Sequence, residues 1–250
     1  MAITDARLGV HQQSEDFTEH DRWDFEHTPP DDYPLLLNYP YFDLYRKQVV
    51  KQADLVLAMH LRPEAFTAEQ KRRNFDYYED LTVRDSSLSA CTQAVLAAEV
   101  GHLDLALDYL GEAALMDLRD LERNTRDGLH MASLAGAWTA LVAGFGGFRA
   151  RHGRASFTPR LPAGLSRLAF RLRYRGRALA VAVTASEARY ELLGGEPIEL
   201  VHHGQPFTLG QGPVVLAVPH LDVPPRPSQP PGRAPTPRLG ARAVGGPRSG

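Results

Sequence analysis

The sequence has very little cysteine and no long apolar segment, and these absences exclude several classes of protein. Cys91 is the single cysteine among 250 residues, so a disulfide framework or a cysteine metal cluster is excluded and a reducing compartment is expected. Because Cys91 stands in an apolar helical run, we interpret it as core filler. No apolar run approaches the roughly 20 residues that span a bilayer, and residues 1–5 lack the character of a signal peptide. We therefore expect a soluble cytoplasmic protein without a membrane partner.

Lysine is absent from the C-terminal part of the chain, where arginine alone carries the basic charge. Residues 149–250 contain 15 arginines and 5 acidic residues, a net charge of +10, whereas residues 1–148 carry −12. This asymmetry indicates two units of different character. The arginines stand in strand-like sequence and in a Pro-rich tail without an aromatic stacking motif, so no nucleic-acid partner is expected. The ten histidines show no His-Glu-x-x-His spacing, so no metal site is expected either.

Length and composition favour one or two domains with a substantial core. Residues 1–43, which are polar and acidic with scattered aromatics, predict an irregular N-terminal arm. Residues 44–150 predict a helical domain and residues 151–220 a β-domain. Residues 221–250 are rich in Pro, Gly, Arg and Ser and predict a disordered tail.

Apolar residues at helical spacing predict a series of helices joined by short loops, and hence antiparallel neighbours. The first predicted helix, Leu44–Leu61, contains Lys51 and Gln52. The second begins at Thr67, where Gln70 completes a capping box, and runs to about Tyr78. The later predicted helices are Leu88–Val100, closed by Gly101, then Leu103–Leu118 and Met131–Phe148.

The period changes from helical to alternating after Arg151. Leu168 to Tyr174 and Leu179 to Val183 flank the turn Arg175-Gly176-Arg177, which predicts a hairpin with one arginine-covered face. Together with the following strands, it predicts a small antiparallel β-sandwich, so the fold class is mainly α plus β. Those further strands are Arg189–Leu193, Ile198–Val201, Pro206–Leu209 and Val214–Val218.

Two polar segments interrupt the helical sequence, Thr82–Ser89 and Asp127–Gly136. Each combines hydroxyl groups with an arginine or a histidine where a helix is predicted to begin. Free backbone N–H groups and the positive end of the helix dipole make such a position suitable for an anion. The alternative interpretation is that these residues are ordinary helix caps.

Six short motifs stand in a fixed order along the chain: Tyr39–Phe42, Val50–Asp54, Asn74–Tyr78, Asp85–Ser89, Asp127–His130 and Gly144–Gly147. In this order they resemble glycoside hydrolase family 65, which comprises maltose, trehalose and kojibiose phosphorylases and some hydrolases. The resemblance runs from about Gly9 to Pro219. It implies part of an (α/α)6 toroid followed by a C-terminal β-domain.

The resemblance also implies roles for individual residues. Lys51 and Gln52 would hydrogen-bond the glucosyl hydroxyls of a disaccharide, and inorganic phosphate would be the co-substrate, with no cofactor. A positioned phosphate needs little further activation because it is already anionic. The phosphate ligands that it implies are Ser86, Ser87 and His130, with Arg84 and the backbone from Ser133 to Gly136 as weaker candidates.

The family pattern also includes a general-acid glutamate in a Gly-Pro-Asp-Glu-Tyr-like segment, which this sequence does not contain. We therefore expect a C-terminal portion of an inverting phosphorylase acting on an α-glucosidic disaccharide of trehalose, maltose or kojibiose type. One alternative is a fragment of a family hydrolase, which would need a carboxylate base to activate water. Another is a truncated, non-catalytic carbohydrate- or phosphate-binding module. A homodimer, or a chain carrying the missing N-terminal half, is the expected protein partner.

Overall fold

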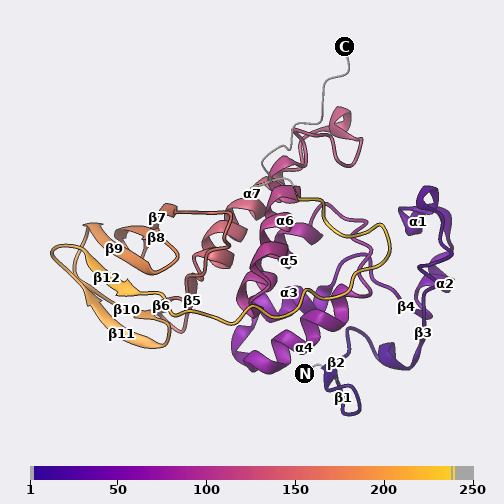
Figure 1. Ribbon diagram of the computed structural model, residues 1–250, viewed down its shortest axis with the longest axis horizontal. Coiled ribbons are helices and arrows are strands. Elements are labelled where there is room, and N and C mark those ends of the chain that lie inside the picture. The colour runs from indigo at the N-terminus through magenta and orange to yellow at the C-terminus, as the bar shows by residue number, and fades with distance from the viewer. Residues whose placement is uncertain (1–2, 238, 240–250) are drawn as a thin grey trace.

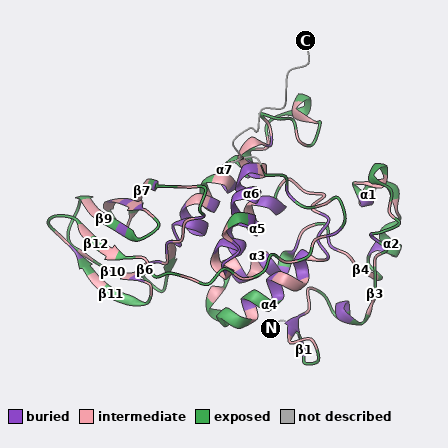
Figure 2. Cartoon of the chain, viewed as in Figure 1, coloured by how far each residue is buried: buried purple, intermediate pink, exposed green. Residues whose placement is uncertain are grey.

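Helices and sheets occupy separate parts of the molecule in the computed structural model, which describes residues 3–237 and 239 (Figure 1). The long helices lie in the centre of the view, the two four-stranded sheets lie to the left, and the N-terminal residues extend to the right. Buried residues gather in the central helices and between the sheets (Figure 2). The predicted mixture of helical and β structure, in that order along the chain, is confirmed.

The central helix is α5, Ser89–Val100, which contacts the other long helices and is built largely from small buried residues. It ends as predicted at Gly101, whose φ of 101° lies in the left-handed region that favours glycine. The predicted capping box is also confirmed, since Thr67 Oγ1 accepts from the Gln70 N–H at 3.2 Å. The helices packed against α5 are α3 (Asp54–Leu61), α4 (Ala68–Glu79), α6 (Leu103–Leu115), α7 (Met131–Thr139) and the π-helical turn η5 (Ala140–Phe145).

The predicted helix Leu44–Leu61 is wrong over most of its N-terminal half, because Lys51 and Gln52 lie in a loop before α3. Tertiary hydrogen bonds hold this segment extended. The Gln48 amide donates to two carbonyls of the N-terminal arm, and Val50 exchanges backbone hydrogen bonds of 3.0 and 2.9 Å with the segment around Leu81 and Val83. These long-range partners outweigh the apolar spacing, which had favoured a continuous helix.

The N-terminal arm consists of short elements, and the first of them pack on α4. The backbone of His11 donates to Asn74 Oδ1 at 2.7 Å and accepts from the Tyr78 hydroxyl at 2.8 Å. Phe17 stacks on Tyr78 with ring centroids 5.8 Å apart. The arm therefore contributes to the helical core. Its elements are β1 (Thr4–Asp5), β2 (Val10–His11), η1 (Phe17–Glu19), β3 (Asp21–Arg22), η2 (Pro30–Asp32), α1 (Leu35–Asn38) and α2 (Tyr41–Leu44), and β3 pairs with β4 (Lys47–Gln48).

The β-domain contains two four-stranded sheets whose inner residues form one core. The predicted hairpin is confirmed, with β7 (Leu168–Tyr174) antiparallel to β8 (Arg177–Val183). The second sheet is completed by β9 (Glu187–Gly194) and β12 (Val214–Ala217) in the order β12-β9-β8-β7. The first sheet has the order β11-β10-β6-β5 and comprises β5 (Arg149–Arg151), β6 (Arg154–Phe157), β10 (Ile198–His202) and β11 (Gln205–Leu209).

One strand pair departs from the expected antiparallel arrangement. Strands β6 and β10 are parallel, with Leu200 opposite Ala155 and His202 opposite Phe157. The chain forms most of the second sheet between these two strands, so β10 returns to β6 by a crossover rather than a hairpin. Sequence patterning identified β10 but not its partner β6, Arg154–Phe157.

The predicted disorder of residues 221–250 is wrong for the residues up to 237, which lie along the helices (Figure 1). Arg226 forms an ion pair of 3.0 Å with Asp108 of α6, and Gly101 approaches Pro224 closely. Polar partners on the helices therefore fix a segment that has few apolar residues of its own. Residue 238 and residues 240–250 lie outside the described residues. Among those described, no helix has the length and hydropathy needed to cross a bilayer.

Candidate functional site

A cavity of about 440 Å³ lies where the N-terminal arm meets the loop before α3, a volume suited to a small ligand. Its polar lining includes Lys51, Gln52, Asp54 and Asp85. The lining also includes apolar and aromatic side chains, among them Phe17, Leu35 and Tyr41 of the arm and the neighbouring Tyr45. A mainly apolar lining with a few polar groups is typical of a site for a small molecule.

The two predicted sugar ligands, Lys51 and Gln52, line this cavity, and one predicted phosphate ligand, Ser86, contacts Gln52 beside it. Ser86 Oγ donates a hydrogen bond of 2.9 Å to Gln52 Oε1, although the two residues are far apart in sequence. The Gln52 amide in turn donates to Asp54 Oδ1 at 3.2 Å. The Lys51 residue is exposed, and its backbone carbonyl accepts a hydrogen bond of 3.4 Å from Ser89 Oγ. Ser87 follows in the same loop and is half-buried.

Asp85 is a residue of this site that the sequence prediction of ligands omitted. Its Oδ2 accepts from the Leu35 N–H at 2.7 Å, and its Oδ1 accepts from Arg233 at 2.5 Å. Burial raises the pKa of the Asp85 carboxyl, although the Leu35 N–H and the charges of Arg233, Lys51 and Arg84 oppose this shift. Asp85 thus connects the Thr82–Ser89 segment, to which it belongs, with Leu35 of the cavity wall and with Arg233 near the C-terminus.

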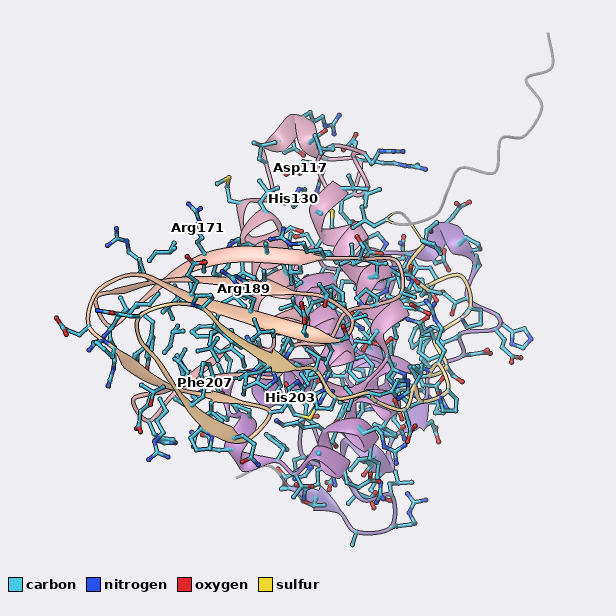
Figure 3. All side chains as sticks on the ribbon, turned by 60° about the vertical axis from the view of Figure 1, so that its left-hand side comes forward. Asp117, His130, Arg171, Arg189, His203 and Phe207 are labelled. Carbon is cyan, nitrogen blue, oxygen red and sulfur yellow. The ribbon has the colours of Figure 1, made fainter. Side chains whose placement is uncertain are left out.

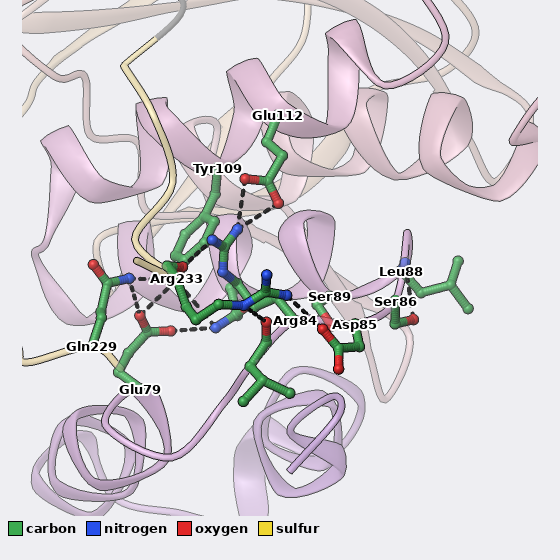
Figure 4. Close-up of polar contacts among 12 residues, drawn as sticks. Glu79, Arg84, Asp85, Ser86, Leu88, Ser89, Tyr109, Glu112, Gln229 and Arg233 are labelled. Carbon is green, nitrogen blue, oxygen red and sulfur yellow. Dashed lines mark hydrogen bonds and ion pairs between the residues drawn. The ribbon is translucent and has the colours of Figure 1, made fainter. Parts of the chain in front are cut away.

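Arg84, predicted as a weaker phosphate ligand, is occupied by protein groups. Its backbone has a φ of 59°, and its side chain is only 8% exposed. The guanidinium donates to both carboxylate oxygens of Glu112 at 2.5 and 2.6 Å and to the carbonyl of Arg233 (Figure 4). Because charge-assisted pairs of this geometry are strong, a phosphate would have to compete with Glu112 for Arg84.

His130 lies at the N-terminus of α7 beside Asp117 (Figure 3). Its backbone N–H donates to Asp117 Oδ2 at 2.9 Å, and its ring Nδ1 lies 2.6 Å from Asp117 Oδ1. Among residues 3–237 and 239, no hydrogen bond or ion pair joins His130 to Ser86 or Ser87. The structure therefore brings Ser86 to Lys51 and Gln52 but does not link His130 to this group.

The geometry does not support a phosphate role for the backbone from Ser133 to Gly136, which lies within α7, because the Ser133 N–H already donates to the His130 carbonyl at 2.9 Å. Ser133 is fully buried, and its hydroxyl donates to the Ala113 carbonyl of α6 at 3.1 Å. A Cβ atom at Gly136 would lie 2.4 Å from the Cβ of Cys91, so this glycine permits close packing of α7 on α5. Both residues belong to helix packing.

The alternative interpretation, that the polar side chains of these segments are ordinary helix caps, is wrong for both helices. The N-cap residues are Leu88 for α5 and His130 for α7, and neither makes a side-chain cap hydrogen bond. Ser86 accepts from the Leu88 N–H at 3.3 Å, but its own hydroxyl proton is directed to Gln52. The polar side chains of these segments therefore mainly join distant parts of the chain.

Two family models match the chain in the order of its two parts. The glycosyl hydrolase family 65 central catalytic domain matches residues 2–139, and the C-terminal domain of the same family matches residues 148–209. The chain therefore belongs to glycosyl hydrolase family 65. This confirms the family that the ordered motifs predicted.

The relatives are longer proteins, and the chain matches one part of each. It is 59% identical over 238 residues to an uncharacterized glycosyl hydrolase of Mycobacterium leprae, covering 94% of this chain and 30% of that protein. It is 41% identical over 207 residues to an α,α-trehalose phosphorylase of Thermoanaerobacter brockii, covering 83% and 27%. A solved structure of a candidate kojibiose phosphorylase from the human microbiome superposes with a TM-score of 0.79 at 25% identity, covering 87% and 29%. The chain thus spans less than a third of the length of these relatives.

Proposed function

We propose that this chain supplies the phosphate side and part of the glucosyl side of the active site of an inverting disaccharide phosphorylase. The observation that carries the proposal is the contact of Ser86 with Gln52 beside a cavity lined by Lys51. Residues from two family motifs that are separate in sequence meet there. Hydroxyl, amide and ammonium groups can bind both a sugar hydroxyl and a phosphate oxygen.

The chemistry requires these groups to position two reactants rather than to activate the nucleophile. Phosphate carries its own charge, so holding it in line with the anomeric carbon supplies much of the rate acceleration. The leaving sugar needs a proton, and we assign that step to a general-acid glutamate outside this chain. The helices α3–α7 would then be one part of an (α/α)6 toroid, and the two sheets a sandwich packed at its end.

The proposed substrate is an α-glucosidic disaccharide of trehalose, maltose or kojibiose type. Similarity to the trehalose phosphorylase of Thermoanaerobacter brockii supports a phosphorylase in general. A hydrolase of the same family is the alternative, and it would release glucose without phosphate. Incubating the chain with each disaccharide, with and without phosphate, separates these activities. We expect no β-glucose 1-phosphate from this chain alone, and robust release would contradict the assignment of the acid to another segment.

Ligand binding tests the proposal directly. Titration calorimetry with inorganic phosphate should give a measurable affinity that falls about tenfold in Ser86→Ala, because one hydrogen-bond donor to an anion is lost. The exposed Ser186 provides a matched control, and Ser186→Ala should bind phosphate like the unchanged chain. Equal affinities in all three proteins would contradict the phosphate assignment.

A non-catalytic module that associates with a partner is a second candidate function. It is favoured by exposed apolar side chains on α1, on α2 and directly after α2, where Leu37, Phe42 and Tyr45 are 80%, 63% and 74% exposed. A chain carrying the preceding family segment, or a second copy of this chain, would cover them. Size-exclusion chromatography with light scattering tests this candidate, and a stable monomer that gains no partner from that segment would count against it.

A further inference from the structure

The C-terminal strap, defined as residues 222–233, lies beyond both family models yet contacts the polar residues of the helical part (Figures 1 and 4). Each of its long polar side chains meets a buried acceptor. Arg226 pairs with Asp108 at 3.0 Å. Gln229 donates to Glu79 Oε2 at 2.8 Å and to the Tyr109 hydroxyl at 2.7 Å, and Arg233 pairs with Asp85.

Arg233 makes the most extensive of these contacts. Its Nε donates to the Val83 carbonyl at 2.7 Å, and another guanidinium nitrogen donates to Asp85 at 2.5 Å. The guanidinium also lies 4.4 Å from the centre of the Tyr33 ring, while the Arg233 carbonyl accepts from Arg84. Arg233 therefore fixes the Thr82–Ser89 segment to the N-terminal arm.

The partner of Arg233 is a cavity-lining carboxylate that has little access to water. The Asp85 side chain is 1% exposed, and its second oxygen holds the Leu35 N–H at the cavity wall. A buried carboxylate needs a paired charge and hydrogen bonds to remain ionised. Without Arg233, Asp85 would lose its direct ion pair, and the hold on Leu35 would weaken.

We propose that the strap is part of the ligand site and that Arg233 is a positioning residue, which orients Asp85 and through it the Leu35 wall of the cavity. This inference rests on the proposed function for the ligand, but the orientation of the wall can be measured without any ligand. The strap would be needed for full affinity, although it touches neither Lys51 nor Gln52.

Hydrogen exchange followed by mass spectrometry tests the structural part on the whole chain. Arg233→Gln should accelerate exchange at Leu35 and Val83 by about tenfold or more. The Leu35 N–H donates to Asp85, and the Val83 peptide, whose N–H donates to Val50, is held at its carbonyl by Arg233. Arg233→Lys should restore part of the protection, since it keeps the charge. Arg171→Gln, which removes an exposed arginine from the sheet face in Figure 3, should leave these amides unchanged.

Phosphate and trehalose titrations test the effect on the ligand site. We expect Arg233→Gln to bind about tenfold more weakly, with partial recovery in Arg233→Lys. The affinity should also change its pH profile. Asp85 faces Arg233 of the strap, Arg84 of its own segment, Lys51 of the loop before α3, Tyr33 of the arm and Glu122, which follows α6. Removing Arg233 raises the pKa of Asp85 further, so affinity should begin to fall at a higher pH on acidification.

The outcomes are distinct. Unchanged exchange at Leu35 and Val83 in Arg233→Gln overturns the positioning role. Tighter binding in Arg233→Gln also overturns it, because the strap would then obstruct the site. If the unchanged chain binds neither phosphate nor trehalose, the proposed function fails, and the positioning of the wall is decided by hydrogen exchange alone.

Discussion

The pair between Arg84 and Glu112 gives a prediction about the region that the sequence singled out first. Replacing Glu112 by Gln keeps the size of the side chain but removes the negative charge beside a guanidinium that is 8% exposed. The two oxygens that lie 2.5 and 2.6 Å from Arg84 become one amide oxygen and one amide group that repels the guanidinium. The folded state should therefore lose stability while keeping its shape.

Breaking a buried pair by removing one partner costs about 3 to 5 kcal/mol, and we expect the lower value because Glu112 is 17% exposed. With a urea dependence of roughly 2 kcal/mol per M, a loss of about 3 kcal/mol lowers the unfolding midpoint by about 1.5 M. Glu69→Gln is the matched control, since Glu69 pairs with Arg72 at 3.1 Å but is 55% exposed. That exposed pair should contribute less than about 1 kcal/mol.

Urea unfolding followed by far-ultraviolet circular dichroism measures both variants. Equal midpoint shifts for Glu112→Gln and Glu69→Gln would refute the argument that burial makes the Arg84–Glu112 pair contribute more to stability than an exposed pair. Phosphate titration of Glu112→Gln then examines the prediction that Arg84 is a phosphate ligand. Tighter binding would support that role because the guanidinium is released, and unchanged binding would exclude it.

Two further predictions concern acid stability and helix packing. Burial, helped by the charge of Arg149, lowers the pKa of His60 from 6.5 to about 4. The unfolded chain therefore binds this proton first on acidification, and stability should fall by up to about 3 kcal/mol between pH 6.5 and pH 4. His60→Gln should reduce this loss in urea midpoints measured across the window, and an unchanged loss would rule out His60 as its source. Gly136→Ala should cost about 1 to 3 kcal/mol through its clash with Cys91. Gly194→Ala, in open space, should change thermal stability little, so similar losses in both would contradict the packing argument.

The parts of the fold that were predicted correctly depend on neighbours in sequence. The capping box of Thr67 and Gln70 closes within one helical turn, and the Gly101 terminus needs only the conformational freedom of glycine. The β7–β8 hairpin likewise follows from alternation on either side of Gly176. In each case the decisive interactions lie within a few residues, where sequence patterns record them.

The incorrect predictions depend on partners far along the chain. Residues 45–53 have apolar residues at helical spacing, but Gln48 takes its acceptors from Thr18 and His20 of the N-terminal arm. The parallel partner of β10 is β6, which precedes it by about 40 residues. No local pattern records such pairings, because they follow from which surfaces meet once the helices and sheets have packed.

The segment Thr82–Ser89 shows the same limit at the candidate site. Its residue types identified it as a place where polar groups gather, and one of the ordered family motifs, Asp85–Ser89, lies within it. Its neighbours in sequence suggested a helix cap or an anion site, however, whereas each of its central side chains has a distant partner. Arg84 pairs with Glu112, Asp85 with Arg233, and Ser86 with Gln52. Because three distant partners hold this segment, Ser86 and Asp85 have fixed positions. A site that binds phosphate beside a sugar requires such fixed positions. The polar residues of this segment thus gain their proposed function from the folded chain, and the C-terminal strap supplies one of the three supports.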